Sequence, residues 1–174
     1  MFDYFPLLSV MDTSPEETFM NLAIQEAQIA KAGGDFPFGA VITHHGKVIA
    51  SGHAENNAKG DATAHAEMQA LRKACTLLGT HNLRDCTIYS THEPCIMCAA
   101  AIFQAKIPKV FFGATREDLP WLMRARKVRI DDLAKDSNFS IQIVQGILKD
   151  KVLELFVDLE AKFSSNQERL QKLK

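Results

Sequence analysis

Two short segments carry residue types that are suited to binding a metal ion. The first is His65-Ala66-Glu67 and the second is Pro94-Cys95-Ile96-Met97-Cys98. An imidazole and two thiolates are preferred zinc ligands, and a catalytic zinc commonly takes three protein ligands and keeps a fourth position for water. His65, Cys95 and Cys98 therefore form a candidate site for one Zn²⁺ per chain.

The spacing of the two cysteines predicts that a helix presents them together. Cys95 and Cys98 are three residues apart, which places two side chains on one helix face with Cβ atoms about 5–6 Å apart. Zn–S bonds of about 2.3 Å then allow both thiolates to reach one tetrahedral ion. Pro94 suits a helix start, and the alanine-rich run Cys95–Ala105 predicts a helix. In its first turn, free N–H groups and the helix dipole lower a cysteine pKa.

Glu67 is a candidate proton carrier and not a fourth ligand. It follows His65 by two residues, and side chains two apart do not share a helix face. We expect it to face the water at the open position, whose pKa zinc lowers from about 15.7 to about 7. Glu67 can then act as general base and general acid. We expect His65 to begin a helix over Ala64–Leu78, capped by Thr63 or Asp61.

A C-x-x-C pair also occurs in structural zinc sites and in redox dithiols. A structural site needs a fourth Cys or His. Cys75 lies ten residues beyond His65, which is about 15 Å along a helix, and Cys86 opens an expected strand, so both suit buried positions. His92, three residues before Cys95, is the remaining candidate for a fourth ligand. We favour the catalytic interpretation.

Composition limits the class of protein. The 174 residues are 47% hydrophobic and 24% charged, as expected of one soluble globular domain over 1–174. The net charge of −1 gives no general attraction to nucleic acid. Four cysteines, two of them assigned to a metal, suit a reducing cytoplasm, and no apolar run is long enough to span a membrane. We interpret residues 1–12 as an N-terminal arm and not a signal peptide, and residues 164–174 as a frayed tail.

The chain order predicts an α/β fold. Ser14 or Thr13 caps a first helix with Pro15 at its first position, and Gly33-Gly34 ends it. Strands are expected at Phe36–Ile42, Lys47–Ser51, Cys86–Thr91, Lys109–Gly113 and Phe139–Val144, with a last helix at Lys149–Phe163. Strands separated by single helices predict a three-layer α/β/α sandwich with a mixed, mostly parallel five-stranded sheet, in which the first hairpin is an antiparallel edge. Ligands of such sheets bind at carboxyl ends of strands, near helix N-termini.

Three blocks carry a family resemblance: Pro37–Ile42 (PFGAVI), Asp61–Leu71 (DATAHAEMQAL) and Glu93–Ile102 (EPCIMCAAAI). The combination of H-x-E with P-C-x-x-C is a known signature of zinc deaminases. On these blocks the chain resembles the cytidine and deoxycytidylate deaminase superfamily over nearly its whole length. Thr63–Gly79 and Asp85–Cys98 look most like the bacterial guanine deaminase branch, whereas the tRNA adenosine deaminases share EPCxMC.

The resemblance implies a zinc-dependent hydrolase that releases ammonia from a nucleobase or nucleoside, by attack of zinc-bound hydroxide. Guanine or a related purine is the first expectation. Adenosine in tRNA and cytosine-type bases are alternatives, and a zinc domain without catalysis is the non-enzymatic one. Relatives are usually dimers, so a homodimer is also implied. Nucleic acid is a less favoured partner, and a membrane is not expected.

The resemblance also implies roles for single residues. It makes His65, Cys95 and Cys98 the zinc ligands and Glu67 the proton shuttle. In addition, Asp118 matches an acidic residue with which guanine deaminases hold the purine edge. The N–H of Ala66 is expected near the reacting amide.

The chain departs from the family pattern at two places. Most relatives have an asparagine where Ala54 stands, and Asn56 or Asn57 would have to substitute for it. Guanine deaminases bring an aromatic residue from the C-terminal end over the site, where this chain offers Phe156 and Phe163.

A flat heterocycle needs apolar faces and a few polar edges. We expect Phe38 to contact the substrate and Trp121 to act as a lid, since Trp121 lies in the irregular stretch Arg116–Arg129. Phe111 and Phe112 are expected mainly in the core. The basic cluster formed by Arg124, Arg126, Lys127 and Arg129 suits phosphate contacts or a solvated surface, and we favour the surface.

Overall fold

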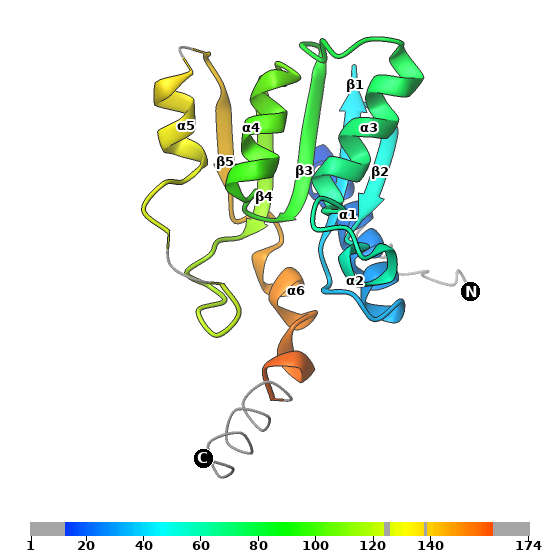
Figure 1. Cartoon of the computed structure of the whole chain (residues 1–174), viewed down its shortest axis with the longest axis vertical. Helices are drawn as coiled ribbons and strands as arrows, with labels where there is room; N and C mark the ends of the chain where they lie inside the picture. The colour runs from blue at the N-terminus through cyan, green and yellow to red at the C-terminus, as the bar shows by residue number, and fades with distance from the viewer. Residues whose placement is uncertain (1–12, 124–125, 138, 162–174) are drawn as a thin grey trace, which may run out of the picture.

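The computed structural model describes residues 13–123, 126–137 and 139–161. The strands are β1 (Gly39–His44), β2 (Lys47–His53), β3 (Cys86–His92), β4 (Lys109–Ala114) and β5 (Gln142–Gln145). The helices are α1 (Pro15–Ala32), α2 (Asn56–Lys59), α3 (Ala66–Leu78), α4 (Ile96–Gln104), α5 (Ile130–Asp136) and α6 (Lys149–Glu154). The strands form one five-stranded sheet in the order β2-β1-β3-β4-β5, as Figure 1 shows.

Helices cover both faces of this sheet (Figure 1), which confirms the predicted α/β/α sandwich. Successive strand residues point to opposite faces, so each central strand contributes to two cores. One core packs against α3, α4 and α5 and includes Ile42, Ile88 and Val110. The other core packs against α1 and α6 and includes Val41, Tyr89 and Phe111. Each of these is adjacent in sequence to one of the three residues of the first core. The layers therefore follow from apolar runs in the strands.

The strand pairings confirm a mixed sheet but correct the expectation that it is mostly parallel. β1 pairs antiparallel with β2 and also with β3. Only the pairings β3–β4 and β4–β5 are parallel among the described residues. The sequence prediction treated the hairpin as an added edge, whereas β1 lies inside the sheet and continues the antiparallel part.

Several element boundaries also differ from the sequence prediction. Two short helices were not predicted: α2, between β2 and α3, and α5, between the last two strands. α5 provides the crossover that parallel pairing of β4 and β5 needs. α6 ends at Glu154, and after a turn at 155–156 the chain is helical again over 157–161, so the predicted last helix is interrupted. Phe163, residues 1–12 and residues 164–174 lie outside the described part of the chain, so the predictions for them stay predictions.

The start of α1 agrees with the sequence prediction. Ser14 is the N-cap residue, and Pro15 opens the helix. The Ser14 hydroxyl accepts a hydrogen bond from the Glu17 N–H, and the Glu17 carboxylate accepts one from the Ser14 N–H, each at 3.2 Å. This reciprocal pair satisfies two N–H groups that a helix start would otherwise leave open.

Gly52, in β2, sets how closely α3 approaches the sheet. A Cβ atom at Gly52 would lie 2.5 Å from the Ala66 carbonyl oxygen and 2.7 Å from the Ala70 nitrogen. Both are backbone atoms of α3, so a side chain at residue 52 would push the helix outward. Since His65 and Glu67 lie at the N-terminal end of α3, this contact also positions residues of the candidate site.

We predict that Gly52→Ala lowers the free energy of unfolding by about 2 kcal/mol or more, because rigid backbone must move to admit the methyl group. Urea denaturation measures this change. Gly33→Ala is the control, since the nearest atom to a Cβ there lies at 3.4 Å, and it should cost less than about 1 kcal/mol. Equal stabilities for the two variants would contradict this account of helix–sheet contact.

Candidate active site

The three predicted metal ligands lie at two neighbouring helix starts. His65 is the N-cap residue of α3 and Cys95 is the N-cap residue of α4, while Cys98 lies in the first turn of α4. The prediction that Thr63 or Asp61 caps α3 is wrong. The Asp61 carboxylate instead accepts hydrogen bonds from the N–H and hydroxyl of Thr63 at 2.7 and 2.8 Å, so it orders the loop before the helix.

The distances between the ligand atoms fit one tetrahedral zinc ion. Cys95 Sγ and Cys98 Sγ are 3.6 Å apart. His65 Nδ1 lies 3.6 Å from Cys95 Sγ and 3.5 Å from Cys98 Sγ. With Zn–S bonds of about 2.3 Å and a Zn–N bond of about 2.0 Å, tetrahedral angles require separations of about 3.5–3.8 Å. His65, Cys95 and Cys98 are therefore spaced to hold zinc.

The proton chemistry of the two thiols also suits a cation. The hydrogen bond between the two thiols lowers the pKa of Cys95 to about 3, with a further contribution from His65. The same hydrogen bond and burial raise the pKa of Cys98. The adjacent Cys95 sulfur raises the pKa of His65. A divalent cation can take the place of these protons, since thiolates and neutral imidazole are its ligand forms.

No fourth protein ligand joins this group among the residues that the structure describes. The cluster of close ligand atoms contains only His65, Cys95 and Cys98. His92 is buried, and its Nδ1 lies 3.1 Å from the Glu93 carbonyl oxygen. Cys86 is buried in the core. The arrangement therefore leaves one coordination position for water, as a catalytic site requires.

Glu67 lies beside the ligands and is itself buried. Its carboxylate accepts a hydrogen bond from the Ser90 hydroxyl at 3.1 Å, which fixes its direction from the neighbouring strand β3. Burial raises the pKa of the Glu67 carboxyl, which favours a group that accepts and returns a proton near neutral pH. No sequence pattern marks Ser90, because a serine in a buried strand has many possible partners.

A cavity of about 390 Å³ opens beside these residues. This volume lies in the range of small-molecule sites, about 300–1,000 Å³. Its walls combine apolar and polar side chains and include His65, Glu67 and Cys95, together with Phe36, Phe38, Ala54, Asn56, Asn57, Ala66, His92, Glu93, Arg116, Leu122, Met123 and Arg126. The chemistry-bearing residues and a space for a substrate therefore coincide.

Three of the predicted substrate contacts line this cavity, namely Phe38, Ala66 and Asn56, and two do not. Asp118 accepts a hydrogen bond from the Thr115 N–H at 2.8 Å and forms an ion pair with Lys149 at 2.5 Å. Trp121 packs against the core under α1 and α6. In this stretch the cavity wall is formed by Leu122 and Met123, which the sequence analysis did not single out.

Phe156, the C-terminal aromatic residue, lies behind the residues that line the cavity. The ring of Phe156 is buried against that of Phe38, with centroids 5.5 Å apart. Phe156 does not line the cavity itself. It therefore supports the position of Phe38.

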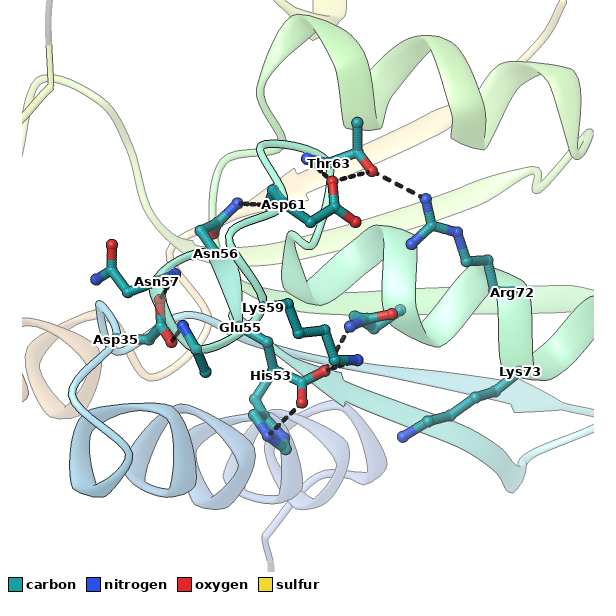
Figure 2. A network of polar contacts seen from close by, with 12 residues as sticks. Asp35, His53, Glu55, Asn56, Asn57, Lys59, Asp61, Thr63, Arg72 and Lys73 are labelled. Carbon is teal, nitrogen blue, oxygen red and sulfur yellow. Dashed lines mark hydrogen bonds and ion pairs between the residues drawn. The ribbon is translucent and has the colours of Figure 1, made fainter.

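The loop between β2 and α3 brings Ala54 and two asparagines to the cavity. Figure 2 shows Asn56 and Asn57 on this loop. The Asn56 amide donates to the Asp61 carbonyl at 3.0 Å, and the Asn57 amide donates to the Gly34 carbonyl at 3.3 Å. Both amide nitrogens thus bind backbone. Ala54 is buried and its side chain offers no polar group, so the position where the family resemblance implies an asparagine adds only a methyl group to the cavity wall.

A polar network holds this loop in place. His53 lies between two carboxylates, with Nδ1 2.7 Å from Glu26 and Nε2 4.0 Å from Glu55. Glu55 also pairs with Lys59 at 2.7 Å and binds the Gln69 amide of α3. Figure 2 shows His53, Glu55 and Lys59 of this network close together beside α3. The network ties the loop to the helix that carries Glu67.

Glu93 and Arg129 form a buried ion pair that the sequence analysis missed. Arg129 donates to the two Glu93 carboxylate oxygens at 2.6 and 2.5 Å, and it also pairs with Glu117. The Glu93 side chain is 1% exposed and that of Arg129 is 26% exposed. The interpretation of the basic cluster as a solvated surface is therefore wrong for Arg129, and Arg126 lines the cavity.

Residues 13–114 match the family model described as the cytidine and deoxycytidylate deaminase zinc-binding region. The chain belongs to this family. The guanine deaminase of Bacillus subtilis is 45% identical over 103 residues, which cover 59% of this chain and 66% of that protein. The tRNA-specific adenosine deaminase of Aquifex aeolicus is 42% identical over 99 residues, or 57% of this chain and 66% of that protein. Each alignment spans just under two thirds of the relative.

Solved structures give the same family. A structure described as a tRNA:A34 deaminase matches with a TM-score of 0.69 and 31% identity, covering 79% of this chain and 98% of that chain. The guanine deaminase of Bacillus subtilis matches with a TM-score of 0.56 and 38% identity, covering 71% and 70%. Within the described ranges, no helix is both long and apolar enough to cross a bilayer.

We predict that removing the Arg129 charge destabilises the fold. Arg129→Met leaves the buried Glu93 carboxylate without its main partner, which should cost about 2–3 kcal/mol, less than for a fully buried pair because Arg129 is 26% exposed. Urea denaturation measures the loss, and adding Glu93→Gln should recover part of it. The exposed neighbour Lys127 gives the control Lys127→Met. A loss of the same size in both single variants would contradict the assigned role of the ion pair.

Proposed function

We propose that the protein is a zinc-dependent hydrolytic deaminase of a free nucleobase or nucleoside, with guanine or a related purine as its foremost substrate. The observation that carries this proposal is the placement of three ligand atoms within 3.6 Å of one another at a cavity that also includes Glu67. Membership of a deaminase family supports it.

The reaction replaces an amino group on a ring carbon by oxygen. When bound by His65, Cys95 and Cys98, the ion would supply Lewis-acid activation of a water. Glu67 takes one proton from that water and delivers it to the ring nitrogen, while a C–O bond forms at the amine-bearing carbon. Glu67 then carries the second proton to the leaving amine, the C–N bond breaks and ammonia departs.

Ser90 and Ala66 have supporting roles in the proposed reaction. Ser90 donates to its carboxylate and keeps it directed toward the cavity during both transfers. Ala66 is the first residue of α3, and the N–H at this position has no partner within its own helix. It is a candidate donor to the reacting group of the substrate, in agreement with the role that the family resemblance implies.

The shape of the cavity supports a flat substrate. Phe36 and Phe38 lie on its wall with ring centroids 6.2 Å apart, and Leu122 and Met123 add apolar surface. Aromatic and aliphatic faces suit a purine ring. We further propose that the chain acts in the cytoplasm as a homodimer in purine metabolism, with a small molecule as its partner.

Adenosine in tRNA is the second candidate. A relative of 42% identity is a tRNA-specific adenosine deaminase, and Arg126, at the cavity, is an exposed cation suited to phosphate. The net charge of −1 argues against extensive contact with nucleic acid. Inosine formation in a tRNA transcript, without turnover of free guanine, would favour this second candidate.

We predict that wild-type protein with one zinc per chain releases ammonia from guanine, and that Glu67→Gln lowers kcat by about 10²–10⁴-fold while it retains the zinc. The amide keeps the shape of the side chain but cannot carry protons. Ammonia release and chromatography of guanine, adenine, adenosine and cytosine give the activity, and metal analysis gives the zinc content. Glu154→Gln, at an exposed site on α6, is the matched control.

The result that would overturn the proposal is specific. Wild-type protein that holds equimolar zinc but releases no ammonia from any free base or nucleoside would contradict it. Full activity of Glu67→Gln would contradict the assigned proton carrier.

A further inference from the structure

His92 is a second chemistry-bearing residue of the cavity, and the proposed reaction does not use it. It is the last residue of β3, it is 4% exposed, and it lines the cavity together with Phe38 and Ala54. The rings of His92 and Phe38 form a T-shaped contact, with centroids 5.6 Å apart and planes at 70°. The imidazole is therefore held in a defined orientation by a neighbour that also faces the substrate space.

The hydrogen bonds of His92 fix which nitrogen carries the proton. Nδ1 lies 3.1 Å from the Glu93 carbonyl oxygen, and a carbonyl only accepts, so Nδ1 must donate. Burial lowers the pKa of His92, with Arg116 acting in the same direction and the Glu93 and Thr115 backbones opposing. The ring is therefore neutral at neutral pH, and its Nε2 is an acceptor.

This acceptor has no hydrogen-bond partner in the described part of the protein. Nε2 of His92 is a buried side-chain atom without one. A buried polar atom left unpaired is unfavourable, and native structures pair nearly all such atoms. Because His92 lies in the wall of a substrate cavity, a donor on the bound substrate is the partner that its position favours.

Arg116 supplies the complementary group. It lines the same cavity, and its charge is close enough to His92 to affect the pKa of the imidazole. A guanidinium offers only donors. Two residues of the cavity wall thus carry an acceptor and a set of donors, while the side chain of Ala54 carries neither.

We propose that His92 and Arg116 together recognise a lactam edge of the substrate, that is, a ring N–H next to a ring carbonyl. His92 Nε2 accepts from the ring N–H, and Arg116 donates to the carbonyl oxygen. This inference rests on the proposed function and narrows it to oxo-purines and related oxo-heterocycles that carry an amino group elsewhere. Nε2 is buried without substrate, so the cavity wall must shift slightly when the ring enters.

The test compares two ligands that differ at this edge. Guanine carries the lactam, whereas 2,6-diaminopurine carries a second amino group and a ring nitrogen without hydrogen there. Calorimetric dissociation constants are measured in the Glu67→Gln background, where slow turnover does not disturb binding. We expect His92→Leu to weaken guanine binding by about 10- to 100-fold and 2,6-diaminopurine binding by less than about threefold. His92→Gln, which keeps an acceptor of similar reach, should retain part of the guanine preference.

Two results would overturn the inference. If His92→Leu leaves the guanine affinity unchanged, the proposed hydrogen bond does not contribute to binding. If His92→Leu weakens the binding of both purines equally, His92 has a structural role instead. Zinc content and thermal unfolding of each variant identify a folding defect. If His92→Leu has such a defect, the binding of the two purines is compared between His92→Gln and the protein with His92. Because the readout is binding, failure of this inference is separable from absence of ammonia release by the wild-type protein.

Discussion

Three ligand atoms from two helix starts, each within 3.6 Å of the others, are the constraint on which the rest of the structure depends. Separations of this size require the N-terminal ends of α3 and α4 to lie side by side. β3 delivers the chain to Cys95, and the close contact between Gly52 and α3 sets the position of His65. Small changes in helix–sheet packing would therefore change the distances between the candidate metal ligands.

The surroundings of the three ligands divide into positioning groups and cavity groups. Ser90 directs Glu67, and the network around His53 and Glu55 ties the β2–α3 loop to α3. The Glu93–Arg129 pair holds the segment after β4 against the end of β3. These contacts hold elements whose polar residues line the cavity, among them Glu67, Asn56 and Glu93. Selectivity for one heterocycle over another must come from such groups, since the apolar faces accept any flat ring.

The sequence was sufficient to predict the layers and the grouping of His65, Cys95 and Cys98, because both depend on short sequence patterns. Apolar runs marked the central strands, and the i, i+3 cysteines with His65 and Glu67 marked the centre of the site. The parallel content of the sheet was overestimated, because local pattern does not show that β1 pairs with β3. α2 and α5 were missed because they are short and polar. The partners of Arg129 and Ser90 lie far away in sequence, so their roles follow only from the folded chain.

The most direct test of the account is the coordination of zinc in the wild-type protein, measured by X-ray absorption at the zinc edge. The account predicts two sulfur ligands at about 2.3 Å, one imidazole at about 2.0 Å and one further oxygen from water. A second imidazole, a third sulfur or a carboxylate that closes the coordination sphere would contradict it. In that case zinc would be structural, and the proposed deamination would lose its basis.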